Sequence, residues 1–133
     1  MKDMIVRGFD PEKDYEDLLN MWATHESMPP PLDVLSPYGV WVEYKGEPVC
    51  CVFMYDTGCS MCIMQFVISN GKMPKEIRNE GLDRMVEECI EWAKESDFKY
   101  IYTATSVQKY INRLEDNGFS KEGTLQQHMF WGL

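Results

Sequence analysis

Apolar and polar positions in the first half of the chain change period several times, and each period predicts one element. Residues 4–9 are the first predicted strand, and Asp10-Pro11-Glu12 opens a helix. Four apolar residues then fall at the i, i+3, i+4 and i+7 spacing of one helix face: Tyr15, Leu18, Leu19 and Trp22. After a proline-rich loop, short polar turns join three strands at residues 40–44, 49–55 and 60–69, which predicts an antiparallel meander.

The second half of the chain predicts a helix, a strand, a second helix and a last strand. The clearest helical stripe in the sequence consists of Leu82, Met85, Val86, Cys89, Ile90 and Ala93. Ser96-Asp97 ends this helix, and residues 100–105 form a strand rich in aromatic and β-branched side chains. The next helix spans the apolar positions from Val107 to Leu114, with Gly118 as its natural C-cap. Residues 123–131 supply the last strand.

These elements predict a mixed α/β (α+β) fold class in the order β-α-β-β-β-α-β-α-β, within a single domain over residues 1–133. The strand–helix–strand unit between residues 60 and 105 implies a right-handed crossover, so its two strands should be parallel neighbours. We therefore expect a mixed sheet, with antiparallel strands from the meander and one parallel pair.

Charge narrows the classes of function. The chain has 133 residues with 13 Lys+Arg against 22 Asp+Glu, a formal net charge of −9, which disfavours sequence-independent binding to nucleic acid. No apolar run approaches the roughly 20 residues that a membrane helix needs. The first residues also break their apolar run too soon for a secretory signal. The sequence predicts a cytoplasmic protein that binds neither nucleic acid nor membrane.

Four of the five cysteines lie close together in the sequence, which raises the question of a metal site. Cys59 and Cys62 have the CxxC spacing that can bind zinc. Cys50 and Cys51 lie in a predicted strand and should point to opposite faces of the sheet, so they would not share one tetrahedral site. The favoured interpretation is that these thiols pack as small hydrophobic groups, with no metal.

Two local motifs resemble the GNAT N-acetyltransferase superfamily. The run Arg78-Asn79-Glu80-Gly81-Leu82-Asp83, at the start of the striped helix, is similar to the family's acyl-CoA-binding signature, Arg/Gln-x-x-Gly-x-Gly/Ala. Residues 112–119 resemble the family's final helix, which typically ends in Gly-Phe, and the element order matches across nearly the whole chain. The resemblance, which extends to small divergent bacteriophage-type GNAT-like proteins, implies a GNAT-like acyl-CoA N-acyltransferase fold.

The resemblance also implies which residues bind acetyl-CoA as a cosubstrate. Free backbone N–H groups at a helix N-terminus bind phosphate, and a glycine lets an oxygen approach closely. Residues 72–84 carry four basic and three acidic side chains, so this segment sums to +1 and the rest of the chain to −10. The expected cofactor-binding residues are Phe66, Val67, Ile68, Ser69, Arg78, Asn79, Glu80, Gly81, Leu82, Asp83 and Arg84. The alternative is a charged helical turn in which Gly81 is a tolerated defect.

Candidates for the catalytic acid and base come from other elements. Leu114 stands where many family members carry a tyrosine that protonates the leaving thiolate, and Asp83 stands where the signature has its second Gly or Ala. Tyr110 lies one helical turn before Leu114 on the same face and is a candidate acid, although a tyrosine in such a stripe also suits a core. The candidate bases are Glu43, His25 and His128, with a water chain as the alternative.

The resemblance implies direct transfer of an acetyl or similar acyl group from CoA to a primary amine of a small molecule or protein. The acidic surface favours a cationic acceptor by steering, and Tyr38, Trp41 and Phe66 are candidates to wall an apolar slot for it. The alternatives are a GNAT-fold binding module without turnover and a phage-type host-directed effector that binds a basic protein. The expected assembly is a monomer or homodimer.

Overall fold

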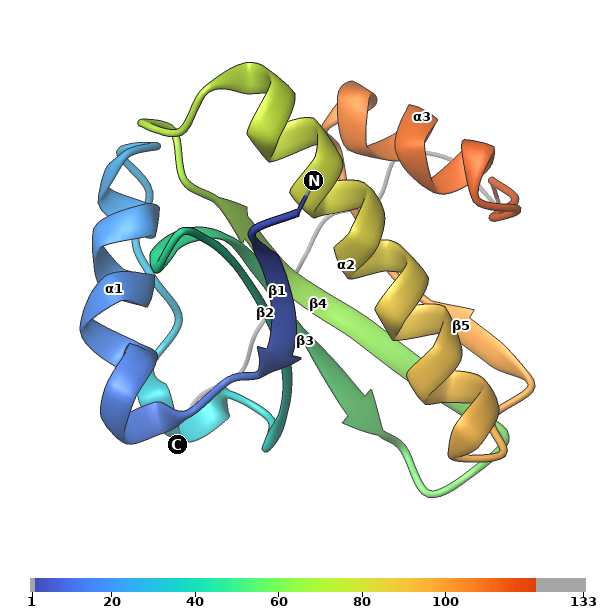
Figure 1. The fold of residues 1–133 in the computed structure, drawn as a ribbon. Helices are drawn as coiled ribbons and strands as arrows, with labels where there is room; N and C mark the ends of the chain where they lie inside the picture. Colours follow the sequence, from blue (N-terminus) through green and yellow to red (C-terminus); the bar gives the residue numbers. More distant parts are fainter. Residues whose placement is uncertain (1, 122–133) are drawn as a thin grey trace.

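The computed structural model describes residues 2–121, which form a five-stranded sheet with helices on both faces (Figure 1). The strands are β1 (Met4–Gly8), β2 (Tyr38–Tyr44), β3 (Glu47–Asp56), β4 (Met61–Ser69) and β5 (Tyr100–Tyr102). They follow one another in chain order across the sheet; β1 to β4 are antiparallel to their neighbours and β5 is parallel to β4. The predicted meander and parallel pair are confirmed. The strand predicted at residues 123–131 lies outside the described residues.

The helices are α1 (Pro11–Ala23), α2 (Lys75–Glu95) and α3 (Gln108–Asp116), with a short 3-10 turn at Leu32–Val34 in the loop after α1. α1 begins as predicted, because the Asp10 carboxylate accepts hydrogen bonds from the N–H groups of Glu12 and Lys13 at 3.0 and 3.4 Å. α3 stops before Gly118, whose φ of 94° is a left-handed conformation that glycine adopts without strain. No helix in the described part of the chain is long and apolar enough to cross a membrane.

Two hydrophobic clusters pack on opposite faces of the sheet. One lies beneath α2 and contains the predicted apolar stripe of that helix, and the other lies beneath α1 and contains Leu18 and Met21. Cys50 and Cys51 are both fully buried, one in each cluster, so the prediction that they point to opposite faces is confirmed. Cys59, in the turn between β3 and β4, is the exposed member of the five cysteines.

α2 begins earlier and β5 ends earlier than the sequence predicts. α2 starts at Lys75, three residues before the motif that was expected to open it. Asn70 organises the preceding loop, because its amide donates to the Pro48 carbonyl at 2.9 Å and its side-chain oxygen accepts from the Lys72 N–H at 3.0 Å. β5 ends at Tyr102, where the chain leaves β4. Both differences shape the candidate site.

Candidate functional site

The sheet opens where β4 and β5 separate. In the described residues, their parallel pairing covers only residues 61–63 of β4, and the Thr103 hydroxyl then donates to the Met64 carbonyl at 2.6 Å. On the other edge of β4, the register with β3 shifts between Cys51 and Phe53. Phe66, in β4 at this bulge, has a φ of 61°, which is uncommon for a non-glycine residue. Bulges re-aim side chains and are frequent beside active sites, so the opening has the backbone distortion of a functional site.

A groove of about 720 Å³ occupies this opening. Its apolar lining comes from both clusters, with Val52, Met64, Leu82 and Tyr110 from the cluster beneath α2 and Trp22, Phe66 and Ile68 from the cluster beneath α1. The other walls are residues 65–69 of β4, the end of α1 with the residues after it, residues 103–107, and the first turns of α2 and α3. The starts of α2 and α3 lie side by side at one end of the molecule (Figure 1). Both helices therefore contribute side chains to the same groove.

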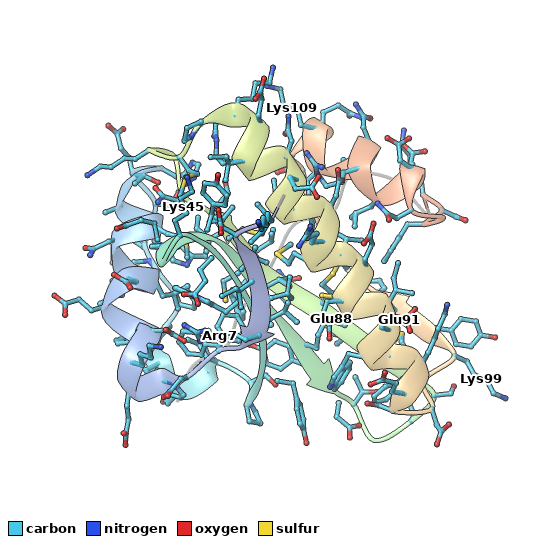
Figure 2. The ribbon with its side chains drawn as sticks, viewed as in Figure 1. Arg7, Lys45, Glu88, Glu91, Lys99 and Lys109 are labelled. Atoms are coloured by element: carbon cyan, nitrogen blue, oxygen red, sulfur yellow. The ribbon has the colours of Figure 1, made fainter. Side chains whose placement is uncertain are left out.

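Among the described residues, lysines and arginines line the groove, whereas aspartates and glutamates do not. Lys75 and Arg78 come from α2, whereas Lys109 and Arg113 come from α3. No carboxylate of residues 2–121 lines the groove, although the whole chain has a net charge of −9. Figure 2 shows Lys109 at the end of the molecule where the two helices begin, with Glu88 farther along α2. The groove thus reverses the charge of the protein locally.

Three of these cations are available to an anion. Within residues 2–121 the side chains of Lys75, Arg78 and Lys109 have no hydrogen-bond or ion-pair partner, and the Arg78 Nε is buried without an acceptor. Both helices also begin without a side-chain cap, after Pro74 in α2 and Val107 in α3. The first N–H groups of each helix therefore add positive potential. This end of the groove has the charge that a phosphate-bearing ligand requires.

Arg113 is the fourth cation and has a second role, because it fastens α3 to α2. Its guanidinium donates to the carbonyl and the side-chain oxygen of Asn79 at 3.1 and 3.0 Å, and it forms an ion pair with the Asp83 carboxylate. This ion pair explains how the chain accommodates a negative charge at this position of the signature. Asp83 departs from the signature by placing a negative charge there, but that charge is bound to Arg113 and does not line the groove.

The signature itself does not sit at the helix N-terminus, and that prediction is wrong. Because α2 begins at Lys75, residues 78–83 run from the end of its first turn into its third, and the Arg78 N–H already donates to the Pro74 carbonyl at 3.0 Å. Gly81 is buried, and a Cβ there would lie 2.5 Å from Cγ1 of Val49 on β3. The glycine is therefore neither a phosphate cradle nor a tolerated defect. It permits the close approach of α2 to the sheet.

The structure brings together most, but not all, of the residues expected to bind acetyl-CoA. Those that line the groove are Phe66, Val67, Ile68, Ser69, Arg78, Asn79 and Leu82. Those that do not line it are Glu80, Gly81, Asp83 and Arg84. The Glu80 carboxylate accepts from Arg84 Nε at 3.1 Å, and Arg84 also lies 3.4 Å from the Met4 carbonyl. These four residues thus hold α2 in place instead of facing the groove.

Tyr110, the candidate acid, lines the groove and also belongs to the core beneath α2. Its side chain is almost completely buried, and its hydroxyl donates to the Met64 Sδ at 3.7 Å. Burial raises the pKa of this hydroxyl well above its usual value. Tyr110 therefore keeps its proton at neutral pH, and the same burial makes its hydroxyl a weaker acid than that of an exposed tyrosine.

Glu43, the candidate base, lies outside the groove lining and belongs to a different cluster. Arg7 Nε donates to Glu43 at 3.4 Å, while the two terminal nitrogens of Arg7 bind the Asp14 carboxylate at 2.7 and 2.8 Å. Asp14 is 2% exposed and also accepts the Asp10 N–H at 2.8 Å. Burial alone would raise the pKa of Asp14, but these hydrogen bonds outweigh burial and lower it. In Figure 2 Arg7 lies between β1 and α1, so this cluster fastens α1 to the sheet.

His25 is the candidate base that the structure places at the groove, and two groove cations were missed by the sequence analysis. The His25 Nε2 lies 2.7 Å from the Ser69 carbonyl, which holds the loop after α1 against β4. Lys109 and Arg113 were missed, although their i, i+4 spacing places them on one face of α3. His128 lies outside the described residues.

The three aromatic residues expected to wall one slot lie on different faces of the sheet, so that prediction is wrong. Trp41 is buried in the cluster beneath α1, against which Phe66 packs. Tyr38 instead contacts Trp92 of α2, with ring centroids 5.3 Å apart. Positions 38 and 41 are an odd number of residues apart in one strand, and such residues point to opposite faces.

Comparison with known proteins supports the fold and no more. No family model and no curated protein matches the sequence. A GNAT-family acetyltransferase from Streptococcus pneumoniae is 16% identical with a TM-score of 0.68, over 90% of this chain and 86% of that chain. Glucosamine-6-phosphate N-acetyltransferase from Arabidopsis thaliana is 11% identical with a TM-score of 0.68, over 96% and 98%. An aminoglycoside acetyltransferase from an uncultured soil metagenomic sample is 10% identical with a TM-score of 0.64, over 99% and 97%. This chain has the fold of the GNAT-family acetyltransferases.

Proposed function

We propose that this protein is an acyl-CoA-dependent N-acyltransferase that moves an acetyl or similar acyl group directly from CoA to a primary amine. One observation carries the proposal: a basic groove, free of carboxylates within residues 2–121, opens where β4 and β5 separate in a GNAT fold. An acidic protein gains nothing for solubility by gathering cations in a concave site, whereas a polyanionic ligand would account for them.

The phosphate groups of CoA would lie against the first turns of α2 and α3. Lys75, Arg78 and Lys109 supply side-chain charges there, and Arg113 borders the same end of the groove. The N–H groups of the Arg78–Gly81 signature are used within the helix, so side chains and the first N–H groups of the helices would replace the backbone cradle. Binding through side-chain charges should weaken with salt.

The thioester end would lie along the distorted part of β4. Beyond residue 63 no described strand pairs with the edge of β4 that faces the groove, so the backbone of residues 66–68 has room to hold a carbonyl oxygen. Hydrogen-bond donors held at such a position stabilise the oxyanion that develops in acyl transfer. Bound acetyl-CoA supplies the activated acyl group. The protonated Tyr110 hydroxyl is the donor for the departing sulfur.

Calorimetric titration of acetyl-CoA into the protein tests the cofactor site, with ATP as a second ligand. We expect micromolar binding that is selective for acetyl-CoA, and at least a tenfold weaker affinity in the double variant Lys75→Gln, Arg78→Gln. Lys94→Gln, which changes an exposed lysine in the last turn of α2, should bind as the wild type does. Absence of binding at saturating acetyl-CoA, or equal binding of ATP, would refute the proposal.

Release of free CoA in the presence of amines tests turnover. Transfer predicts CoA release that depends on both the acyl donor and the amine, with a new amide detected on the acceptor by mass spectrometry. Binding without release for a broad amine panel would instead indicate a binding module. Such a result would separate the cofactor site, which calorimetry tests, from the chemistry.

A further inference from the structure

The charges of the groove constrain its amine acceptor, and this inference rests on the function proposed above. The Lys and Arg side chains that line the groove come from α2 and α3, while the end of α1 and the loop after it offer Trp22, His25 and Ser27, with Gln65 from β4. We propose that the acceptor is a molecule with a single weakly basic amine, such as the α-amino group of a peptide, and that polyamines and lysine side chains are poor acceptors.

Within residues 2–121 the carboxylates that adjoin lining residues in the sequence, such as Glu26 and Glu76, do not themselves line the groove. Asp83 is paired with Arg113, and Glu80 is paired with Arg84. The base predicted from the sequence, Glu43, is bound to Arg7. An ammonium group entering the groove therefore meets no side-chain carboxylate of the lining that residues 2–121 provide.

The lysine and arginine side chains of the groove do not stabilise a positively charged acceptor. With acyl-CoA bound, its phosphates would neutralise Lys75, Arg78 and Lys109, and the acceptor end would then present Trp22, His25, Ser27 and Gln65, none of which is a carboxylate. Without a counter-charge, burial disfavours the protonated form of an amine and lowers its pKa. A polyamine would have to bury further ammonium groups with no partner, which is costly. The groove consequently selects amines that enter uncharged.

Amines differ greatly in the fraction of molecules that is uncharged at a given pH. The α-amino group of a peptide has a pKa of about 7.8 and a lysine side chain one of about 10.4, so near neutral pH the uncharged fraction of the former is a few hundredfold larger. The reacting groups then balance without a carboxylate base. The neutral nitrogen attacks the thioester carbonyl carbon, the C–N bond forms, the C–S bond breaks, and the sulfur takes the Tyr110 proton. The nitrogen loses its extra proton to solvent, and solvent reprotonates Tyr110.

This conclusion differs from the expectation that the net charge of the protein favours a cationic acceptor. The net charge of −9 acts on a molecule approaching from solution, and salt screens it over roughly 8 Å. Inside the groove the acceptor meets individual groups at contact distance, where unscreened local charges decide which protonation state binds. Steering can bring a polyamine to the surface without giving it a site.

Two isomeric dipeptide amides test the inference. Both contain Ala-Lys and one acetyl group; one has a free α-amine with an acetylated lysine, and the other has a blocked N-terminus with a free lysine amine. At about pH 7.5 and with saturating acetyl-CoA, kcat/KM should be at least about tenfold higher for the free α-amine. The free lysine amine should gain about tenfold for each unit of rising pH, as its neutral fraction grows. Spermidine should react no faster than the lysine amine.

Faster reaction of the lysine amine or of spermidine would overturn the inference, and so would bound acetyl-CoA with no transfer to the α-amine. Absence of acetyl-CoA binding in calorimetry would instead refute the proposed function beneath it. A charge introduced at Ser27, an exposed groove residue in the loop after α1, gives a second test. Ser27→Asp should lower the ratio of kcat/KM for the α-amine to kcat/KM for the lysine amine severalfold. Ser27→Asn, which has the shape of the aspartate variant without its charge, should leave this ratio unchanged.

Discussion

At Gly81 helix α2 packs directly against the side chain of Val49 on β3. A Cβ at this position would lie 2.5 Å from Cγ1 of Val49 and 3.5 Å from the Sγ of Cys50, both of which are fully buried. Glycine normally weakens a helix interior by about 1 kcal/mol relative to alanine. Here that cost is outweighed by the close packing of α2 on the sheet, which a side chain larger than that of glycine would disturb.

Gly81→Ala should therefore destabilise the protein by about 1–2 kcal/mol, because overpacking in a filled core exceeds the gain in helix propensity. Urea unfolding measures the difference. In a Val49→Ala background the same change should be neutral or stabilising, since the contact at 2.5 Å is gone. Glu87→Ala, on the exposed face of α2, should change stability by less than about 0.5 kcal/mol. A Gly81→Ala protein as stable as the wild type would contradict this account of the glycine.

At the scale of the elements, α3 is held over the groove by two kinds of contact. Tyr110 and Leu114 anchor its apolar face in the core, and Arg113 fastens it to α2 through Asn79 and Asp83. Its first turn lacks a side-chain cap within the described residues, because Val107 stands at the capping position. The start of α3 also lines the groove. Its stability should therefore influence how well the groove is formed.

Val107→Ser tests whether the missing cap limits this helix. Val107 is exposed and has the extended backbone that suits a cap, so a serine hydroxyl should satisfy one free N–H and stabilise α3 by about 1 kcal/mol. Amide hydrogen exchange in α3 should slow about fivefold relative to the matched Val107→Ala control. Equal exchange rates in the two variants would show that the start of α3 is not limited by capping.

Two elements show what the sequence could and could not foresee. The apolar stripe from Leu82 to Ala93 identified α2, because helical spacing is visible in the sequence without knowledge of what the helix packs against. The start of α2 was misplaced, since it depends on the hydrogen bond that Asn70 donates to Pro48 of a distant strand and on the one that it accepts from Lys72 in its own loop. β5 was predicted too long because residues 103–105 have the composition of a strand and yet leave β4.

The groove was only half visible from the sequence for a related reason. The residues of β4 and α2 adjoin each other in the chain, so a local motif could suggest them. Lys109 and Arg113 come from α3, and their position beside Lys75 and Arg78 exists only after folding. Glu43 looked like a free strand carboxylate, but Arg7 binds it from the neighbouring strand. Sequence patterns give the type of each side chain, while the choice of ionic partner is made by the tertiary structure.

At the scale of the whole molecule, the Arg7–Asp14–Glu43 cluster joins α1 to the two strands at one edge of the sheet. Asp14 is nearly inaccessible to solvent, and its pKa is lowered in the folded state. A group of this kind stabilises the fold above its unfolded pKa of about 3.9, and that contribution is lost as the pH falls through the lower, folded pKa. The cluster therefore links α1 docking to acidity.

Asp14→Asn should cost about 2 kcal/mol at neutral pH, because it removes the charge that Arg7 binds through two hydrogen bonds. The difference between wild type and variant should shrink as the pH falls below about 4. Urea unfolding across this range measures it. Asp17→Asn, on the exposed face of α1, is the matched control and should lose little at either pH. A difference for Asp14→Asn that stays constant down to strong acid would contradict the assigned role.

The distribution of thiols has a practical consequence for anyone who handles the protein. Cys59 is exposed, and a hydrogen bond with the Thr57 hydroxyl at 3.0 Å lowers its pKa, whereas burial raises the pKa of the other four cysteines. A thiol-specific dye should therefore label the native chain once, in the turn between β3 and β4, and the unfolded chain five times. Labelling stoichiometry becomes a direct count of folded molecules. A colorimetric assay for released CoA will start from one protein equivalent of signal, which Cys59→Ser would remove.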